Sequence, residues 1–190
     1  MKVTFTKMNG RRYHVAIERE NGPELVARQA PGYDAHLPHD VAHLLVELEF
    51  GIRLGVFGQL AAGGEGVFTP APADRSTRSR RTAHRIAEVG RSDMARSERL
   101  VNMCVPLWEA RCGRKPKFPA VIDMTLGTPF EADRAMHRFD EAAARWESLA
   151  VGESMSYEWP ESLTFRLAGS PAGRRPARGG DRRVRVGASH

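Results

Sequence analysis

Two histidines four residues apart, His39 and His43, are the residues of this sequence best suited to chemistry. They occur in the string "LPHDVAHLLVELEFG", with Asp40 between them and Glu47 one turn beyond His43. Residues at this spacing lie one above the other on a helix, so both imidazoles can reach one metal ion. Asp40 offers a base, and Glu47 offers a carboxylate that orients His43. The pattern predicts a divalent-metal site, for which zinc is a suitable ion.

Two histidines need at least one more ligand, and the sequence offers three candidates. His36 lies just before the expected helix, Glu65 lies in a glycine-rich loop, and His84 lies in a later helical segment. Glu47 is about 12 Å along the helix axis from His39. It is therefore expected to support His43 rather than to share a metal with His39.

The strings around these histidines resemble motifs of two hydrolase families. "HDVAH" resembles the HExxH motif of zincin metallopeptidases, with Asp40 in the place of the glutamate. "LPHDVAH" is similar to the "LLHDIGH" string of HD-domain phosphohydrolases, whose paired His-Asp binds a divalent metal. By this resemblance, His39 and Asp40 would be the metal pair. Both resemblances imply metal-activated water that attacks an ester, amide or phosphoester of a small-molecule or peptide substrate. The HD-domain family is all-helical, whereas this chain begins with strand patterns.

Other interpretations remain open at this stage. Asp40 is also favoured in a first helical turn by the helix dipole, and His43 with Glu47 could be an ordinary surface pair. The chain also resembles small proteins of unassigned activity from high-GC bacteria, in its Ala/Arg/Gly-rich composition and its "LPHD" helix opening. The alternative function is a non-catalytic binding or regulatory protein. It would use the arginine-rich segment from Arg75 to Arg99, and the C-terminal tail, against an acidic partner.

The composition indicates a cytoplasmic globular protein. No apolar run reaches the roughly 18 residues of a membrane span, and the first residues lack the apolar region of a secretion signal. A membrane partner is therefore not expected. The two cysteines, Cys104 and Cys112, are about 12 Å apart if helical, which is too far for a disulfide. Both are expected to be buried thiols.

The formal charge of +6 comes mostly from the last 21 residues. That stretch carries six arginines and one acid, so the remainder has 23 basic and 22 acidic residues. Because the stretch has little to bury, it is expected to be a disordered tail, residues 170–190, after a single domain at residues 1–169. Nucleic acid could bind the tail, although a solubilising extension is the favoured interpretation.

The expected elements form an α+β fold, with a small antiparallel sheet and about three helices. "VTFTK" and "RYHVAIER" alternate apolar and polar residues around Asn9-Gly10, which predicts a hairpin, and "PELVAR" predicts a third strand. "ESMSYEW" and "ESLTFRLA" predict two C-terminal strands that join the same sheet. A further short strand is expected at Ala120–Met124.

Helices are expected in three places. The first runs from Pro38 to about Phe50, with Gly51 as its stop. The second occupies Ser76 to about Arg111, kinked or broken at Gly90 and Pro106. The third begins at the capping box of Thr128 and Glu131 and runs to Leu149. The segment from Gly58 to Asp74 is expected to be a loop.

Overall fold

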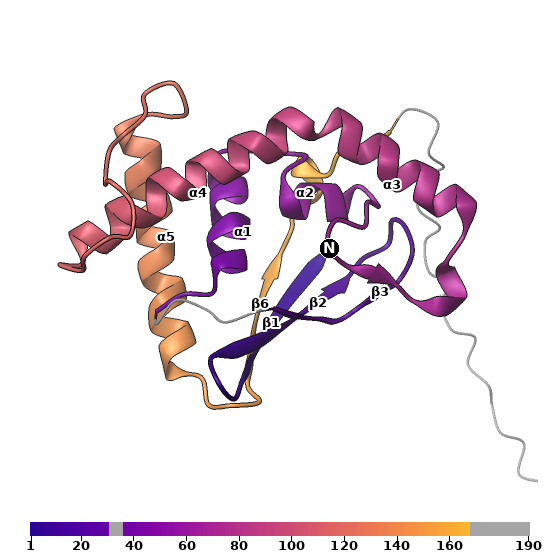
Figure 1. The fold of residues 1–190 in the computed structure, drawn as a ribbon, viewed down its shortest axis with the longest axis horizontal. Coiled ribbons are helices and arrows are strands. Elements are labelled where there is room, and N and C mark those ends of the chain that lie inside the picture. Colours follow the sequence, from indigo (N-terminus) through magenta and orange to yellow (C-terminus); the bar gives the residue numbers. More distant parts are fainter. Residues whose placement is uncertain (31–35, 168–190) are drawn as a thin grey trace, which may run out of the picture.

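The computed structural model describes residues 1–30 and 36–167, and its centre is a four-stranded antiparallel sheet (Figure 1). β1 (Lys2–Met8) and β2 (Arg12–Glu18) form the predicted hairpin. Gly10 and Arg11 take positive φ in its turn. β6 (Ser154–Glu158) pairs with β1, and β4 (Arg28–Ala30) pairs with β2, which gives the order β4-β2-β1-β6. The expectation that the two ends of the chain share one sheet is confirmed.

Five helices accompany the sheet in the described residues. They are α1 (His39–Glu49), α2 (Val56–Ala61), α3 (Thr77–Val89), α4 (Arg91–Arg111) and α5 (Pro129–Ser148). Two-residue strands β3 (Leu25–Val26) and β5 (Thr69–Pro70) pair with each other, and 3-10 turns lie at Pro72–Asp74 and Glu161–Leu163. The fold is therefore α+β, as the sequence predicts.

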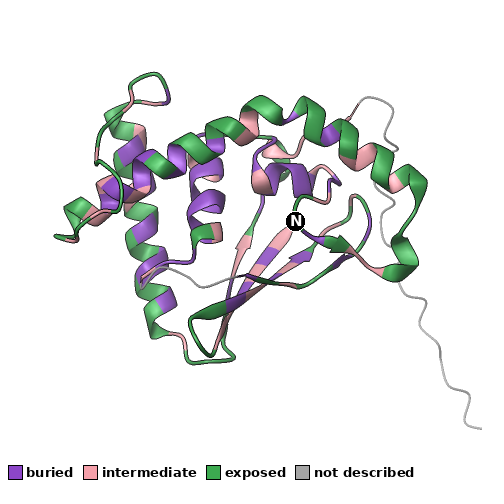
Figure 2. Cartoon of the chain, in the orientation of Figure 1, coloured by how far each residue is buried: buried purple, intermediate pink, exposed green. Residues whose placement is uncertain are grey.

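The core lies between one face of the sheet and the helices α1, α2, α4 and α5 (Figure 2). Phe5 of β1 packs edge-on against Phe57 of α2, with ring centroids 6.2 Å apart. Tyr13 of β2 meets Trp146 of α5 at the same distance. α1 packs against α2, α4 and α5, so all of its residues from Val41 to Val46 are buried. The helix that carries His43 is thus the central helix of the core.

Three local expectations are wrong. The second C-terminal strand is absent from the described residues, where Glu161–Leu163 forms a 3-10 turn instead. Residues 120–124 form no strand, and the first residues of the loop expected at 58–74 belong to the helix α2, which ends at Ala61. Pro106 lies inside α4 without breaking it, so only Gly90 divides the long helical segment, and a kink at Pro106 stays a prediction. Glycine is required there because a Cβ would lie 2.8 Å from the Leu54 carbonyl oxygen.

The cysteines are both free, but only one is buried. Cys104 packs in the core, and burial raises the pKa of its thiol to about 12. Cys112 is exposed at the end of α4, which corrects the expectation for that residue. No helix in residues 1–30 and 36–167 has the length and apolar character to cross a membrane. The predicted tail, residues 170–190, lies outside the described residues.

Candidate functional site

His39 and His43 lie on one side of α1, as their spacing predicts. The helix begins at His39 with Pro38 as its N-cap residue, one position later than expected, because Pro38 keeps an extended ψ of 134°. The two imidazole rings meet edge-on, with centroids 4.7 Å apart. His39 is exposed, whereas only 3% of the surface of His43 is accessible to solvent. The pair therefore runs from the protein surface into the core.

Glu47 is completely buried and holds the start of α2 in place. Its Oε1 accepts from the backbone N–H of Val56 at 2.5 Å, and its Oε2 accepts from Phe57 and Gly58 at 2.9 and 3.1 Å. These are amides that a helix leaves unpaired at its N-terminus. Gly55, the N-cap residue of α2, has no side chain to accept them, and a Cβ there would lie 2.3 Å from Glu47 Oε1.

Ser97 of α4 connects Glu47 to His43. The Ser97 hydroxyl donates to Glu47 Oε1 at 2.8 Å, and Ser97 Oγ lies 3.0 Å from His43 Nδ1. Because an ionised Glu47 can only accept, the hydroxyl proton is directed at Glu47, and Ser97 Oγ accepts a hydrogen bond from the N–H of His43 Nδ1. The network thus assigns the proton of His43 to Nδ1 and leaves Nε2 with a free lone pair. The sequence predicts Glu47 as the orienting partner of His43; the structure inserts Ser97 between them.

The lone pair of His43 Nε2 faces a carboxylate. Glu98, also on α4, places its Oε2 3.7 Å from Nε2, and 53% of its side chain is exposed. Burial, and after it the neighbouring His39, lower the pKa of His43 to about 4. His43 is therefore neutral near pH 7. Two acceptor atoms, Nε2 and Oε2, then face each other at the edge of the core.

This arrangement approaches the geometry of two ligands on one metal ion. Ligand atoms at about 2.0–2.1 Å from a tetrahedral zinc lie about 3.3 Å apart. The distance of 3.7 Å between His43 Nε2 and Glu98 Oε2 is slightly longer than that. Within residues 1–30 and 36–167, no three His, Cys, Asp or Glu side chains already surround one point. Metal binding here requires rotation of the exposed side chains of His39 and Glu98.

Asp40 and His36 are engaged elsewhere. Asp40 forms an ion pair with Arg28 of β4, and its backbone N–H lies 3.5 Å from the Tyr13 hydroxyl, so it is held on the sheet side of α1. His36 lies before α1, 3.7 Å from Glu147 of α5. The structure therefore does not gather the two around His43.

His84 and Glu65 also lie apart from His43 in the described structure. His84 is 73% exposed on α3 and lies 3.5 Å from Glu88 one turn on. Glu65 lines a cavity at the start of α3, together with Arg75 and Arg80. His84 faces Glu88, whereas His43 faces Glu98, and Glu65 forms no hydrogen bond or ion pair with His43. Their role as metal ligands stays a prediction.

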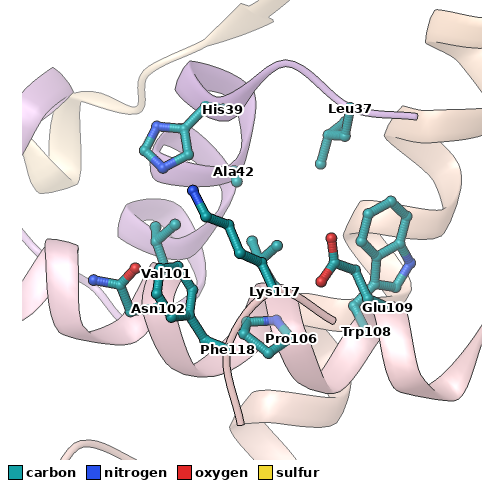
Figure 3. Close-up of a pocket in the computed structure, with 11 residues that line it drawn as sticks. Leu37, His39, Ala42, Val101, Asn102, Pro106, Trp108, Glu109, Lys117 and Phe118 are labelled. Atoms are coloured by element: carbon teal, nitrogen blue, oxygen red, sulfur yellow. The ribbon is translucent and has the colours of Figure 1, made fainter. Parts of the chain in front are cut away.

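A mostly apolar pocket of about 230 Å³ opens beside His39, between α1, α4 and the segment that follows α4 (Figure 3). Its apolar wall comes from both helices, from the segment before α1 and from the later segment: Leu37, Ala42, Val101, Val105, Pro106, Trp108 and Phe118. Four polar side chains complete the lining, namely His39, Asn102, Glu109 and Lys117. Clefts with an apolar wall and a few polar groups are typical of small-molecule sites.

A second exposed feature is the cationic face of α3. Ile86 is its only buried residue, so the helix lies largely outside the core (Figure 2). Four of its arginines are exposed and make no ion pair or hydrogen bond within the described part of the chain: Arg78, Arg80, Arg81 and Arg85. These four residues are called the α3 arginine face below.

Sequence reasoning missed Ser97 and Glu98. The signal for Ser97 is its register, because it lies one turn before Leu100 and Val101 in the stripe that α4 buries. A serine in such a stripe needs a hydrogen-bond partner. Glu98 carries no local signal. Comparisons with models of known families, with curated sequences and with solved structures found no match.

Proposed function

We propose that the protein binds a divalent metal ion at His39, His43 and Glu98 and uses it to hydrolyse a small molecule. Zinc suits this mixture of imidazole nitrogen and carboxylate oxygen. The observation that carries the proposal is the 3.7 Å between His43 Nε2 and Glu98 Oε2. Two acceptors so close repel each other unless a cation or a donor lies between them.

The surroundings of His43 support a ligand role. A histidine ligand commonly donates its other ring N–H to an oxygen that is itself hydrogen-bonded, and Ser97 with Glu47 provides this chain. A neutral imidazole is the form that binds metal, and His43 is neutral near pH 7 because burial lowers its pKa.

A divalent ion at this point would polarise a carbonyl or phosphoryl oxygen and lower the pKa of water. The pocket beside His39 would hold the apolar part of the substrate. Asp40 is ion-paired with Arg28, so we assign it no proton transfer. Glu47 has a positioning role, because it holds Ser97 and reaches the metal face only through it.

Zinc titration of protein without a histidine tag tests the proposal. We expect one zinc per chain by calorimetry, after dialysis against a chelator and then against buffer. Glu98→Gln removes a charged ligand from a half-exposed side chain, so folding should be unaffected, and affinity should fall at least tenfold. His43→Ala should lower affinity at least a hundredfold. His84→Ala is the matched control, since His84 also has a carboxylate one turn on, and it should change nothing.

Circular dichroism of each variant separates loss of a ligand from loss of the fold. The proposal is wrong if the parent protein binds no zinc, or if zinc binds equally well to folded Glu98→Gln and His43→Ala proteins.

A second candidate function is binding of nucleic acid through the α3 arginine face. The specific observation in its favour is that these four side chains form no ion pair with any of the described residues. Arginine suits phosphate because its planar guanidinium donates in a fixed fork. The body of the chain is nearly neutral, so attraction would be local to this helix.

Fluorescence anisotropy with a labelled RNA oligonucleotide tests this candidate. Replacing all four arginines by glutamine should weaken binding and reduce the slope of log affinity against log salt by about 3, because about 0.7 counterions are released per phosphate neutralised on a single strand. Arg166→Gln is the control, since Arg166 is exposed but paired with Glu161. An unchanged slope in the quadruple variant would exclude the α3 arginine face.

A further inference from the structure

The pocket beside His39 has an uneven distribution of charge. Lys117 extends toward the end where His39 lies, and Glu109 lies toward the other end (Figure 3). In the described residues the Lys117 ammonium makes no ion pair or hydrogen bond. The Lys117 ammonium lies over the ring of Phe118, with Nζ 5.5 Å from the ring centroid. A cation that makes no ion pair with the described residues, at the end of an apolar pocket away from Glu109, favours an anionic group on the ligand.

The walls set the size and shape of the ligand. The side chains of Val101, Val105 and Trp108 come from one face of α4, and Ala42 comes from the facing side of α1. Both helices belong to the core, so this part of the pocket is preformed. At about 230 Å³, the space is below the usual range of roughly 300–1,000 Å³ for drug-sized ligands. It suits a flat or branched group of about ten non-hydrogen atoms.

We infer that the pocket binds a small apolar carboxylic acid, with the carboxylate between Lys117 and His39 and the apolar body against Trp108. This inference rests on the proposed function in one respect, namely that the acid is the acyl part of the hydrolysed substrate. Water would add to the acyl carbon, the bond to the leaving oxygen or nitrogen would break, and the leaving group would take one proton of the water. Lys117 would hold the product carboxylate.

Binding of phenylacetate, compared with its neutral amide, tests the inference on chelator-treated full-length protein. For a ligand of this size we expect a dissociation constant near 1 mM for phenylacetate. Phenylacetamide should bind five- to tenfold more weakly, because it offers Lys117 no charge. Chemical shifts of the indole N–H of Trp108, which lines the pocket and donates to Asp140, provide the readout.

Variants of two lysines in the same segment complete the experiment. Lys117→Met should lower the affinity for phenylacetate five- to tenfold and leave the affinity for phenylacetamide unchanged. Lys115→Met should alter neither, since Lys115 is exposed and does not line the pocket. Both lysines are at the surface, so the fold should tolerate either change. Equal affinity for acid and amide, or an unchanged preference in Lys117→Met, overturns the inference.

The metal-free protein separates this inference from the proposed function. If phenylacetate binds with the expected preference but zinc does not bind, the acid pocket stands and the metal proposal fails. If zinc binds but phenylacetate shows no dependence on Lys117, the metal proposal stands and the acid pocket fails.

Discussion

Replacing Glu47 by glutamine should lower the free energy of unfolding by about 3 kcal/mol at pH 8. The carboxylate accepts four hydrogen bonds in a site closed to water, three of them from backbone amides at the start of α2. An amide NH₂ in place of one oxygen would face those donors with another donor. For a domain of this size the loss corresponds to a melting temperature about 6–12 °C lower.

Thermal melts of the Glu47→Gln and Glu98→Gln variants and of the parent protein at pH 8 test this prediction. Glu98 is half-exposed on α4, so its change should stay within about 0.5 kcal/mol of the parent protein. If both variants melt with the parent, Glu47 does not hold α2 as described.

The site was only partly predictable from the sequence. The positions of its two histidines depend on local spacing, whereas its other contacts join residues of different elements. The placement of His39 and His43 on one face of a helix follows from local spacing, and so do the alternating strands that form the sheet. The six-residue helix α2 has no such signal. It contains Gly58, and its unpaired amides are satisfied by Glu47, nine residues before its first residue. No local pattern encodes that contact.

Burial on all sides of α1 likewise depends on tertiary packing. The apolar residues beside the histidines, such as Val46, indicate that something covers this face, but not which element does so. The covering element is α4, whose Ser97 and Glu98 stand next to each other in the sequence and reach different nitrogens of His43. His84 and Glu65 are expected as partners because the long helix and the glycine-rich loop that carry them are expected to face the histidines, and that expectation fixes no distance.

His43 should stay neutral from pH 8 down to about pH 4, whereas an unperturbed histidine gains its proton near pH 6.5. Because the pKa of His43 is lower in the folded state, its contribution to stability is fully present above pH 6.5 and is lost as pH falls through 4. The full loss is about 3 kcal/mol. The proton-linked part of the Glu47 contribution has the opposite direction: burial raises its pKa to about 7 against the lowering effect of its hydrogen bonds, so this part is present below pH 4.5 and is lost as pH rises through 7. The four hydrogen bonds that the ionised form accepts are retained at pH 8.

These two contributions offset each other between about pH 4.5 and 6.5, so a melting curve of the parent protein cannot isolate His43. Nitrogen NMR of the imidazole ring reports on His43 alone. The central claim is that Ser97 and Glu47 hold the proton of His43 on Nδ1 and leave Nε2 free toward Glu98. Long-range proton–nitrogen spectra at pH 8, where the Glu47 carboxyl is ionised and can only accept, should show His43 as the Nδ1–H form with an unprotonated Nε2. A protonated Nε2 at pH 8, as the other tautomer or as imidazolium, would contradict it.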